Sequence, residues 1–148
     1  EIEYSFWLEA YVQARMLKDW INEATEDELS NLYGIGPGDI YAARDTASWI
    51  AASLSRISTI KNLHRLSNKL ETISMRIKYG IKEDILELIK LEGIGRVRAR
   101  ILFNAGIRSL EQLAKTPVKR ITALPGFGSR LVHNLKEQLR KMGYEIIL

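Results

Sequence analysis

The sequence contains no cysteine among its 148 residues and no long run of apolar residues. Disulfides and thiolate metal sites are therefore excluded, and the lack of cysteine is compatible with a reducing cytosol. No apolar segment approaches the roughly 18 residues that a membrane-spanning helix needs, and no secretory signal is visible. We therefore expect no membrane partner.

Motifs for nucleotide chemistry are also missing. The sequence has no GxxxxGK(S/T) loop and no Asp-Glu metal-binding box, so nothing in it would hold ATP phosphates and magnesium. His64 and His133 lie far apart, and each is expected on a helix surface. We therefore expect no catalytic residue, metal site or cofactor in this chain. The chain begins with Glu1 rather than Met, which suggests a segment excised from a longer protein.

Charge is distributed unevenly along the chain. Residues 1–79 carry nine Lys and Arg against eleven Asp and Glu, a net charge of −2, whereas residues 80–148 carry thirteen against seven, a net charge of +6. A basic surface is what a polyanion such as DNA requires, although a solvated lysine-rich surface is the alternative interpretation.

Almost every segment repeats its apolar residues at intervals of three or four, which predicts an all-α protein. The first helix has an apolar stripe, and Thr25 with Glu28 forms a capping box for a short helix that stops at Gly34. Pro37 starts a long helix that is expected to reach about Arg56, and a further helix ends at Gly80. The expected stripes are Phe6, Ala10, Ala14, Leu17 and Ile21; Ile40, Ala43, Ala47, Ile50, Ala51 and Leu54; and Ile60, Leu63, Leu66, Leu70, Ile73 and Ile77.

Shorter helices follow from Ile81. They are expected near residues 82–91, 96–105, 109–115, 118–123 and 129–141. We place a domain boundary near residue 80, with a helical bundle over 1–80 and a second domain over 81–148.

Three segments share the pattern Leu-x-Gly-(Ile/Phe)-Gly: LYGIG at 32–36, LEGIG at 91–95 and LPGFG at 124–128. Glycine permits a tight reversal and a close approach of backbone N–H groups to a ligand. The helix that follows directs its unpaired N–H groups and its positive dipole end to the same place, which suits a phosphate oxygen. Such a contact holds the DNA backbone and reads no bases.

The LEGIG and LPGFG hairpins are the candidate DNA contacts. Ile94 and Phe127 are expected to be their inward anchors, and each hairpin precedes an amphipathic helix. The arrangement resembles a tandem helix-hairpin-helix domain over 81–141, which implies binding to DNA without sequence specificity; purely structural turns are the alternative. The LYGIG segment precedes Asp39, which would repel a phosphate, so we interpret it as a helix-start turn only. The predicted DNA-binding residues here are Gly93, Ile94, Gly95, Arg96, Arg98, Arg100, Gly126, Gly128, Ser129 and Arg130.

Trp49 lies nearly opposite the apolar stripe of the long helix and should be exposed. An exposed tryptophan on a polar face usually contacts something. It can stack on the bases of single-stranded nucleic acid, or pack against another domain or the first helix. On the helix wheel alone both uses stay open. Arg56 lies near Trp49 on the wheel, Tyr41 flanks it, and Arg44 sits at the edge of the apolar stripe.

The order of these features resembles a known family. The segments KDWINEATEDELSNLYGIGPGDIYAARDTASWI and RIKYGIKEDILELIKLEGIGRVRARILFNAGIRSLEQL resemble the C-terminal part of archaeal superfamily-two DNA helicases of the Hjm/HelQ type. The resemblance runs from about residue 15 to 115 and weakens toward the C-terminus. It implies a helical domain related to the Sec63 module, then a small helix-hairpin-helix domain. The motor, two RecA-like domains using ATP and magnesium, would lie outside this chain.

The resemblance also implies roles for residues of the long helix. In the family this helix is a ratchet beneath the single strand, with an arginine and a tryptophan touching DNA. Trp49 takes the place of the family tryptophan, which favours base stacking. The family arginine lies about two turns earlier, where this sequence has Tyr41 and Ala42. Arg44, Tyr41 and Arg56 are the candidates to replace it.

Together these observations predict a sequence-independent DNA-binding part of an ATP-dependent 3′→5′ helicase that guides single-stranded DNA at forks, in DNA repair or replication. Its partners would be single-stranded and forked DNA and the motor domains of the same helicase. We expect a monomer in the cytoplasm of an archaeal cell. The alternatives are a helical scaffold for protein interaction and an accessory DNA-binding domain of a nuclease or repair complex.

Overall fold

The computed structural model describes residues 2–147 and divides the chain into two compact units, one up to Glu83 and one from Asp84 on. Over those described residues it contains helices and no β-strand, which confirms the all-α prediction. None of the helices in residues 2–147 has both the length and the apolar character to cross a membrane.

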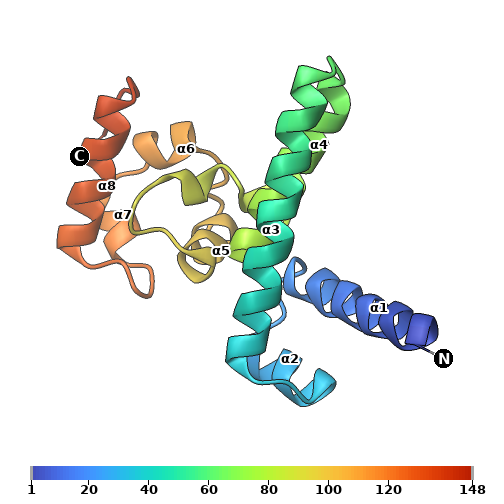
Figure 1. Cartoon of the computed structure of the whole chain (residues 1–148). Coiled ribbons are helices and arrows are strands. Elements are labelled where there is room, and N and C mark those ends of the chain that lie inside the picture. The colour runs from blue at the N-terminus through green and yellow to red at the C-terminus, as the bar shows by residue number, and fades with distance from the viewer. Residues whose placement is uncertain (1, 148) are drawn as a thin grey trace. The chain divides into compact units, whose positions relative to one another are not determined.

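The first unit is built around a long helical hairpin. Its elements are α1 (Ile2–Trp20), α2 (Glu26–Tyr33), α3 (Pro37–Ile60) and α4 (His64–Tyr79). The helices α3 and α4 run antiparallel side by side, whereas α1 and α2 lie near the N-terminal end of α3 (Figure 1). The helical bundle with one long helix is therefore confirmed.

The ends of these helices follow the local signals in the sequence. The carboxylate of Glu28 accepts from the backbone N–H of Thr25 at 2.7 Å, and the Thr25 hydroxyl accepts from the N–H of Glu28 at 3.2 Å, which completes the predicted capping box. Gly34 and Gly80 end α2 and α4 in the left-handed conformation. Helix α3 continues one turn beyond the expected Arg56, to Ile60.

The core of the first unit forms where α1, α2 and α3 meet. Met16, Trp20, Leu29 and Ile40 are buried together. The indole N–H of Trp20 donates to the carbonyl oxygen of Ile77 at 2.7 Å, which ties α1 to the end of α4. The stripe expected along α1 packs only in its C-terminal part, because Phe6 and its apolar neighbours toward the N-terminus are exposed.

The predicted apolar stripes of α3 and α4 are wrong in detail. Large apolar residues of both stripes, including Ile50, Leu54, Leu66 and Ile73, are exposed, whereas a face of small residues is buried between the helices. That face consists of Ser48, Ala51, Ser55 and Ser58 on α3 with Ser67 and Ser74 on α4. The physical reason is that serine can bury its hydroxyl when the facing helix supplies a hydrogen-bond partner.

The second unit contains shorter elements. They are the 3₁₀ turns η1 (Glu83–Ile85) and η2 (Leu88–Lys90), then α5 (Arg96–Asn104), α6 (Leu110–Lys115), α7 (Val118–Thr122) and α8 (Ser129–Lys141). The helix expected over 82–91 is therefore two 3₁₀ turns. Ile85, Leu88 and Leu91 are buried at intervals of three, which is the period of a 3₁₀ helix.

Each helix of the second unit contributes buried apolar residues. The unit's largest buried apolar residues are Ile85, Leu88, Leu91, Leu102, Ile107, Leu110, Leu113, Ile121, Phe127, Leu135 and Leu139. Leu91 and Phe127 belong to the two glycine hairpins. Because both residues are buried, they anchor the hairpins, and α5 and α8 begin directly after those hairpins.

Candidate nucleic-acid interface

The two hairpins of the second unit are repeats of one structure. Their first glycines, Gly93 and Gly126, have φ of +89° and +78°, which favour glycine. Their second glycines, Gly95 and Gly128, are the N-caps of α5 and α8. The residues between the glycines, Ile94 and Phe127, are buried, as the sequence indicated.

The second glycines are not required by the fold. Gly95 and Gly128 have φ of −93° and −72°, which other residues adopt readily. A Cβ atom at either position would have no heavy atom of the described chain within 4 Å. By contrast, a Cβ on Gly93 would lie 2.8 Å from Cδ1 of Leu131, so Gly93 is needed for packing. Gly95 and Gly128 thus leave open space at the starts of α5 and α8.

The N-cap residues of these two helices supply no cap of their own. Gly95 and Gly128 have no side chain, so neither can accept from the first-turn N–H groups of its helix as Thr25 or Ser109 does. The LYGIG segment differs, because the carboxylate of Asp39 accepts from the backbone N–H of Gly36 at 3.1 Å. At α3 the protein's own carboxylate occupies the position that an external anion would take, which agrees with the interpretation of LYGIG as a helix-start turn.

The arginines after the LEGIG hairpin have different surroundings. Arg96 is half-buried at the first position of α5. Arg98 donates from Nε to the carbonyl of Gly126 and from Nη1 to the carbonyl of Gly93, both at 3.0 Å. Arg100 donates to both carboxylate oxygens of Asp84, at 2.8 and 3.0 Å. The guanidinium groups of Arg98 and Arg100 are thus engaged within the protein, and their contact with DNA stays a prediction.

The start of α8 is more open. Ser129 and Arg130 are both exposed. They occupy the same positions after the LPGFG hairpin as Arg96 and Val97 occupy after the LEGIG hairpin. Val97 itself is exposed as well. The first turns of α5 and α8 therefore both present accessible residues beside a glycine N-cap.

Trp49 stands clear of the first unit. Its side chain is 71% exposed, which confirms the exposure expected from the helix wheel. Arg56 is also exposed and lies two turns farther along α3 on the same side of the helix. Trp49 and Arg56 are thus both exposed on one side of α3, away from the serine-lined contact with α4.

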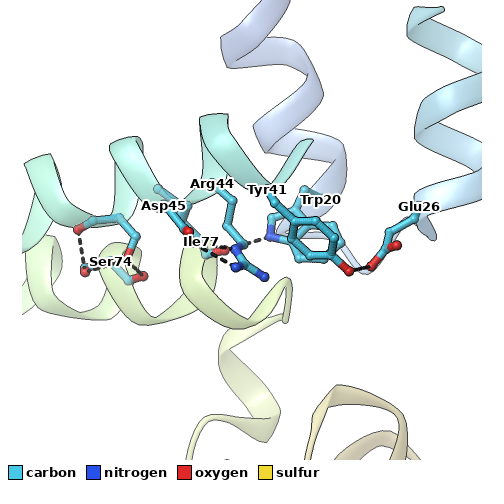
Figure 2. A network of polar contacts seen from close by, with 8 residues as sticks. Trp20, Glu26, Tyr41, Arg44, Asp45, Ser74 and Ile77 are labelled. Atoms are coloured by element: carbon cyan, nitrogen blue, oxygen red, sulfur yellow. Dashed lines mark hydrogen bonds and ion pairs between the residues drawn. The ribbon is translucent and has the colours of Figure 1, made fainter. Parts of the chain in front are cut away.

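Tyr41 and Arg44 take part in a different structure. The Tyr41 hydroxyl donates to Glu26 of α2, the Arg44 guanidinium lies 4.5 Å from the centre of the Tyr41 ring, and Arg44 pairs with Asp45 at 2.8 Å (Figure 2). This network joins the starts of α2 and α3. Of the three candidates to replace the family arginine, only Arg56 shares the helix face of Trp49.

Both units of the chain resemble known protein families. Residues 1–80 match the family model described as archaeal helicase, domain 4. The chain belongs to this family. Residues 85–141 also match a SAM-like helix-hairpin-helix tandem, which covers both glycine hairpins. The expected family resemblance is confirmed, and it extends beyond residues 15–115 in both directions.

Relatives of this chain carry the description ATP-dependent DNA helicase Hel308. The protein of Thermoplasma acidophilum is 41% identical over 133 residues, which is 90% of this chain and 20% of the relative. That of Caldivirga maquilingensis is 37% identical over 142 residues, 95% of this chain and 19% of the relative. That of Aeropyrum pernix is 42% identical over 130 residues, which is 87% of this chain and 18% of the relative. The chain spans about a fifth of the length of these relatives.

One buried contact, made by Lys136, was not foreseen from the sequence pattern. Lys136 is only 1% exposed, and its Nζ donates to the carbonyl oxygens of Leu113, Ala114 and Thr116 at 3.1, 2.7 and 2.6 Å. It thereby caps the C-terminal end of α6. Burial lowers the pKa of Lys136. The available signal was its place in the apolar stripe formed by Val132, Leu135 and Leu139.

A second missed contact fixes the LEGIG hairpin to α8. The side-chain amide of Gln138 accepts from the backbone N–H of Glu92 at 2.8 Å and donates to the carbonyl of Glu92 at 3.0 Å. The amide of Gln138 thus bonds to both the N–H and the carbonyl of one residue, as a neighbouring β-strand would. With the packing of Leu131 against Gly93, it holds the LEGIG hairpin in place before any ligand arrives.

Proposed function

We propose that this chain is a sequence-independent DNA-binding part of an ATP-dependent DNA helicase, and that its two glycine hairpins each bind a DNA phosphate. The observation that carries the proposal is the identity of Gly95 and Gly128. Neither backbone angle nor packing requires glycine there, yet both N-cap positions hold glycine instead of a side chain that could cap the helix. A side chain would occupy the space through which a phosphate oxygen reaches the N–H groups.

Charge and family support the same function. The chain from residue 80 on carries a net charge of +6, and Arg96 and Arg130 lie in the first turns of α5 and α8. The family match covers a helix-hairpin-helix tandem, and the relatives are described as DNA helicases. Since the contacts are to phosphates, binding should be independent of base sequence and should weaken steeply with salt.

We further propose that α3 guides the single strand. Trp49 would stack on a base, and Arg56, about 10 Å farther along the helix axis, would neutralise a phosphate. The exposed position of Trp49 and the internal pairing of Arg44 support this assignment. In the whole helicase, acting 3′→5′ on forked DNA in an archaeal cytoplasm, ATP and magnesium would bind to the motor domains.

The motor domains would contact the exposed apolar surface of α3 and α4. Ile50, Leu54 and Ile57 on α3 and Leu66 and Ile73 on α4 are each 41–53% exposed. A set of large apolar side chains on one helical hairpin is typical of a protein contact. The relatives, about five times as long as this chain, have room for such domains.

The experiment that tests the hairpin function replaces both second glycines by aspartate. Asp is a favourable N-cap, so Gly95→Asp with Gly128→Asp should leave the chain at least as stable. Its carboxylates should nevertheless repel phosphate and lower DNA affinity by tenfold or more, measured as fluorescence anisotropy of a labelled oligonucleotide. Thermal unfolding of the same samples checks the fold.

The matched control is Gly36→Asp. It makes the same change at the second glycine of LYGIG, where Asp39 already occupies the cap. We expect this variant to bind DNA nearly as the natural chain does. Equal losses in the control and in the double variant, or no loss in either, would show that the hairpins do not bind phosphate.

A further inference from the structure

Arg98 joins the two hairpins of the second unit. Its Nε donates to the carbonyl of Gly126 in the LPGFG hairpin, and its Nη1 donates to the carbonyl of Gly93 in the LEGIG hairpin. Both bonds measure 3.0 Å, and both acceptors are the first glycine of their hairpin, in a left-handed conformation. A single side chain therefore contacts the same point of two repeated turns.

The repetition of the hairpin makes this contact one half of a crossed pair. Arg98 lies three residues after Gly95, and Leu131 lies three residues after Gly128. Arg98, on α5, reaches the hairpin that precedes α8, whereas Leu131, on α8, packs against Gly93 of the hairpin that precedes α5. Each helix thus holds the opposite hairpin, one through a polar side chain and the other through an apolar one.

The chemistry of the guanidinium matters for this contact. Its N–H donors are fixed in one plane, so two carbonyls that bind it are held at a set separation. A lysine ammonium carries the same charge on a flexible stem and does not impose that separation. The donors of Arg98 that point to the two carbonyls are also directed into the protein rather than toward a ligand.

We infer that Arg98 is a positioning residue, which sets the spacing between the starts of α5 and α8 so that both bind phosphates of one DNA molecule together. The inference rests on the proposed function of the hairpins and adds how they are coupled. When two sites are held at the correct spacing, the second contact forms within the same complex and affinity increases well beyond that of one site. Without Arg98 the two sites remain but no longer match the DNA.

The test compares a ligand that can fill one site with a ligand that must span both. Inorganic phosphate is titrated into the whole chain while the amide NMR signals of Gly95 and Gly128 are followed, and a short labelled DNA duplex is titrated by anisotropy. For Arg98→Gln and Arg98→Lys we expect phosphate affinity within about twofold of the natural chain and DNA affinity lowered about tenfold or more. Arg140→Lys is the matched control: it makes the same change at an exposed position in the last turn of α8, away from both hairpins, and should bind DNA like the natural chain.

Two results would overturn the inference. If Arg98→Lys binds DNA like the natural chain while Arg98→Gln does not, Arg98 acts through its charge. If phosphate and DNA affinity decrease together, Arg98 maintains each site rather than their spacing. If the natural chain shows no shift at Gly95 and Gly128 with either ligand, the proposed function of the hairpins itself fails.

A measurement on the natural chain removes any dependence on how the variants fold. The Nε–H signal of Arg98 should already report a hydrogen bond in the free protein, and it should move little when DNA is added. A shift of this signal as large as that of the Gly95 and Gly128 amides would identify Arg98 as a DNA contact and contradict the positioning role.

Discussion

Ser48 and Ser74 exchange hydrogen bonds across the α3–α4 hairpin. The Ser74 hydroxyl donates to the carbonyl of Ser48 at 2.8 Å, and the Ser48 hydroxyl donates to the carbonyl of Ser74 at 3.2 Å. Two turns farther along α3 and two turns back in α4, the hydroxyl of Ser55 donates to the carbonyl of Ser67 at 2.9 Å. The hairpin that carries Trp49 is therefore joined by serine pairs instead of large apolar side chains.

Enlarging one serine of this contact should destabilise the first unit. Ser74→Leu removes a buried hydrogen bond and replaces a hydroxyl by a bulky isopropyl group between closely packed helices, so we expect the free energy of unfolding to decrease by about 2–4 kcal/mol. Asn68→Leu, at an exposed position of the same helix, should change it by less than about 0.5 kcal/mol. Urea unfolding followed by circular dichroism measures both. A Ser74→Leu chain as stable as the Asn68→Leu chain would show that the contact tolerates apolar packing.

Removing the Trp49 indole should abolish a fluorescence signal of DNA binding. Short single-stranded DNA should quench the natural chain, whereas Trp49→Ala should lose that quenching and about tenfold in affinity, which corresponds to about 1.4 kcal/mol. Trp7→Ala is the matched control, because Trp7 is 60% exposed and stacks between Tyr4 and Tyr11 of α1. Quenching that survives in Trp49→Ala and disappears in Trp7→Ala would move the strand contact to α1. Unchanged affinity in both would favour a protein contact for Trp49.

Replacing Lys136 should leave the end of α6 uncapped. Lys136→Met keeps much of the side-chain length but removes the donor to three carbonyls, so we expect a loss of about 1–3 kcal/mol in the free energy of unfolding near neutral pH. Lys141→Met, at an exposed position of the same helix, should have little effect.

The stability that Lys136 contributes should also depend on pH, because the pKa of Lys136 is lowered in the folded chain. Between the folded-state pKa and the ordinary value of 10.5, the unfolded chain binds more protons than the folded chain. Stability from this group therefore increases as pH rises through that window. The stability difference between the natural chain and Lys136→Met should widen toward pH 10.5. A difference that narrows at alkaline pH contradicts a lowered pKa.

Much of the fold could be predicted because the signals are local. The capping box at Thr25, the proline at the start of α3 and the glycines that end α2 and α4 act within a few residues of chain, so they can be read directly. The exposure of Trp49 likewise followed from the period of a single helix. The two 3₁₀ turns before the LEGIG hairpin were missed because a helical spacing of apolar residues does not separate an α-helix from a tighter one.

The sequence by itself determined the all-α class, the three glycine segments and the repetition of the hairpin in the second unit, since composition and short-range spacing are enough for these. Only the tertiary structure decided which polar groups meet a partner. Serines became the buried face of α3 because α4 offers carbonyls to them, and Arg44 turned to Asp45 and Tyr41 while Arg56 remained on the face of Trp49. Arg98 reached from one hairpin to the other. Hydrogen bonds between residues 26 or 28 positions apart depend on how the helices pack against each other. The local sequence pattern of one helix does not determine that packing.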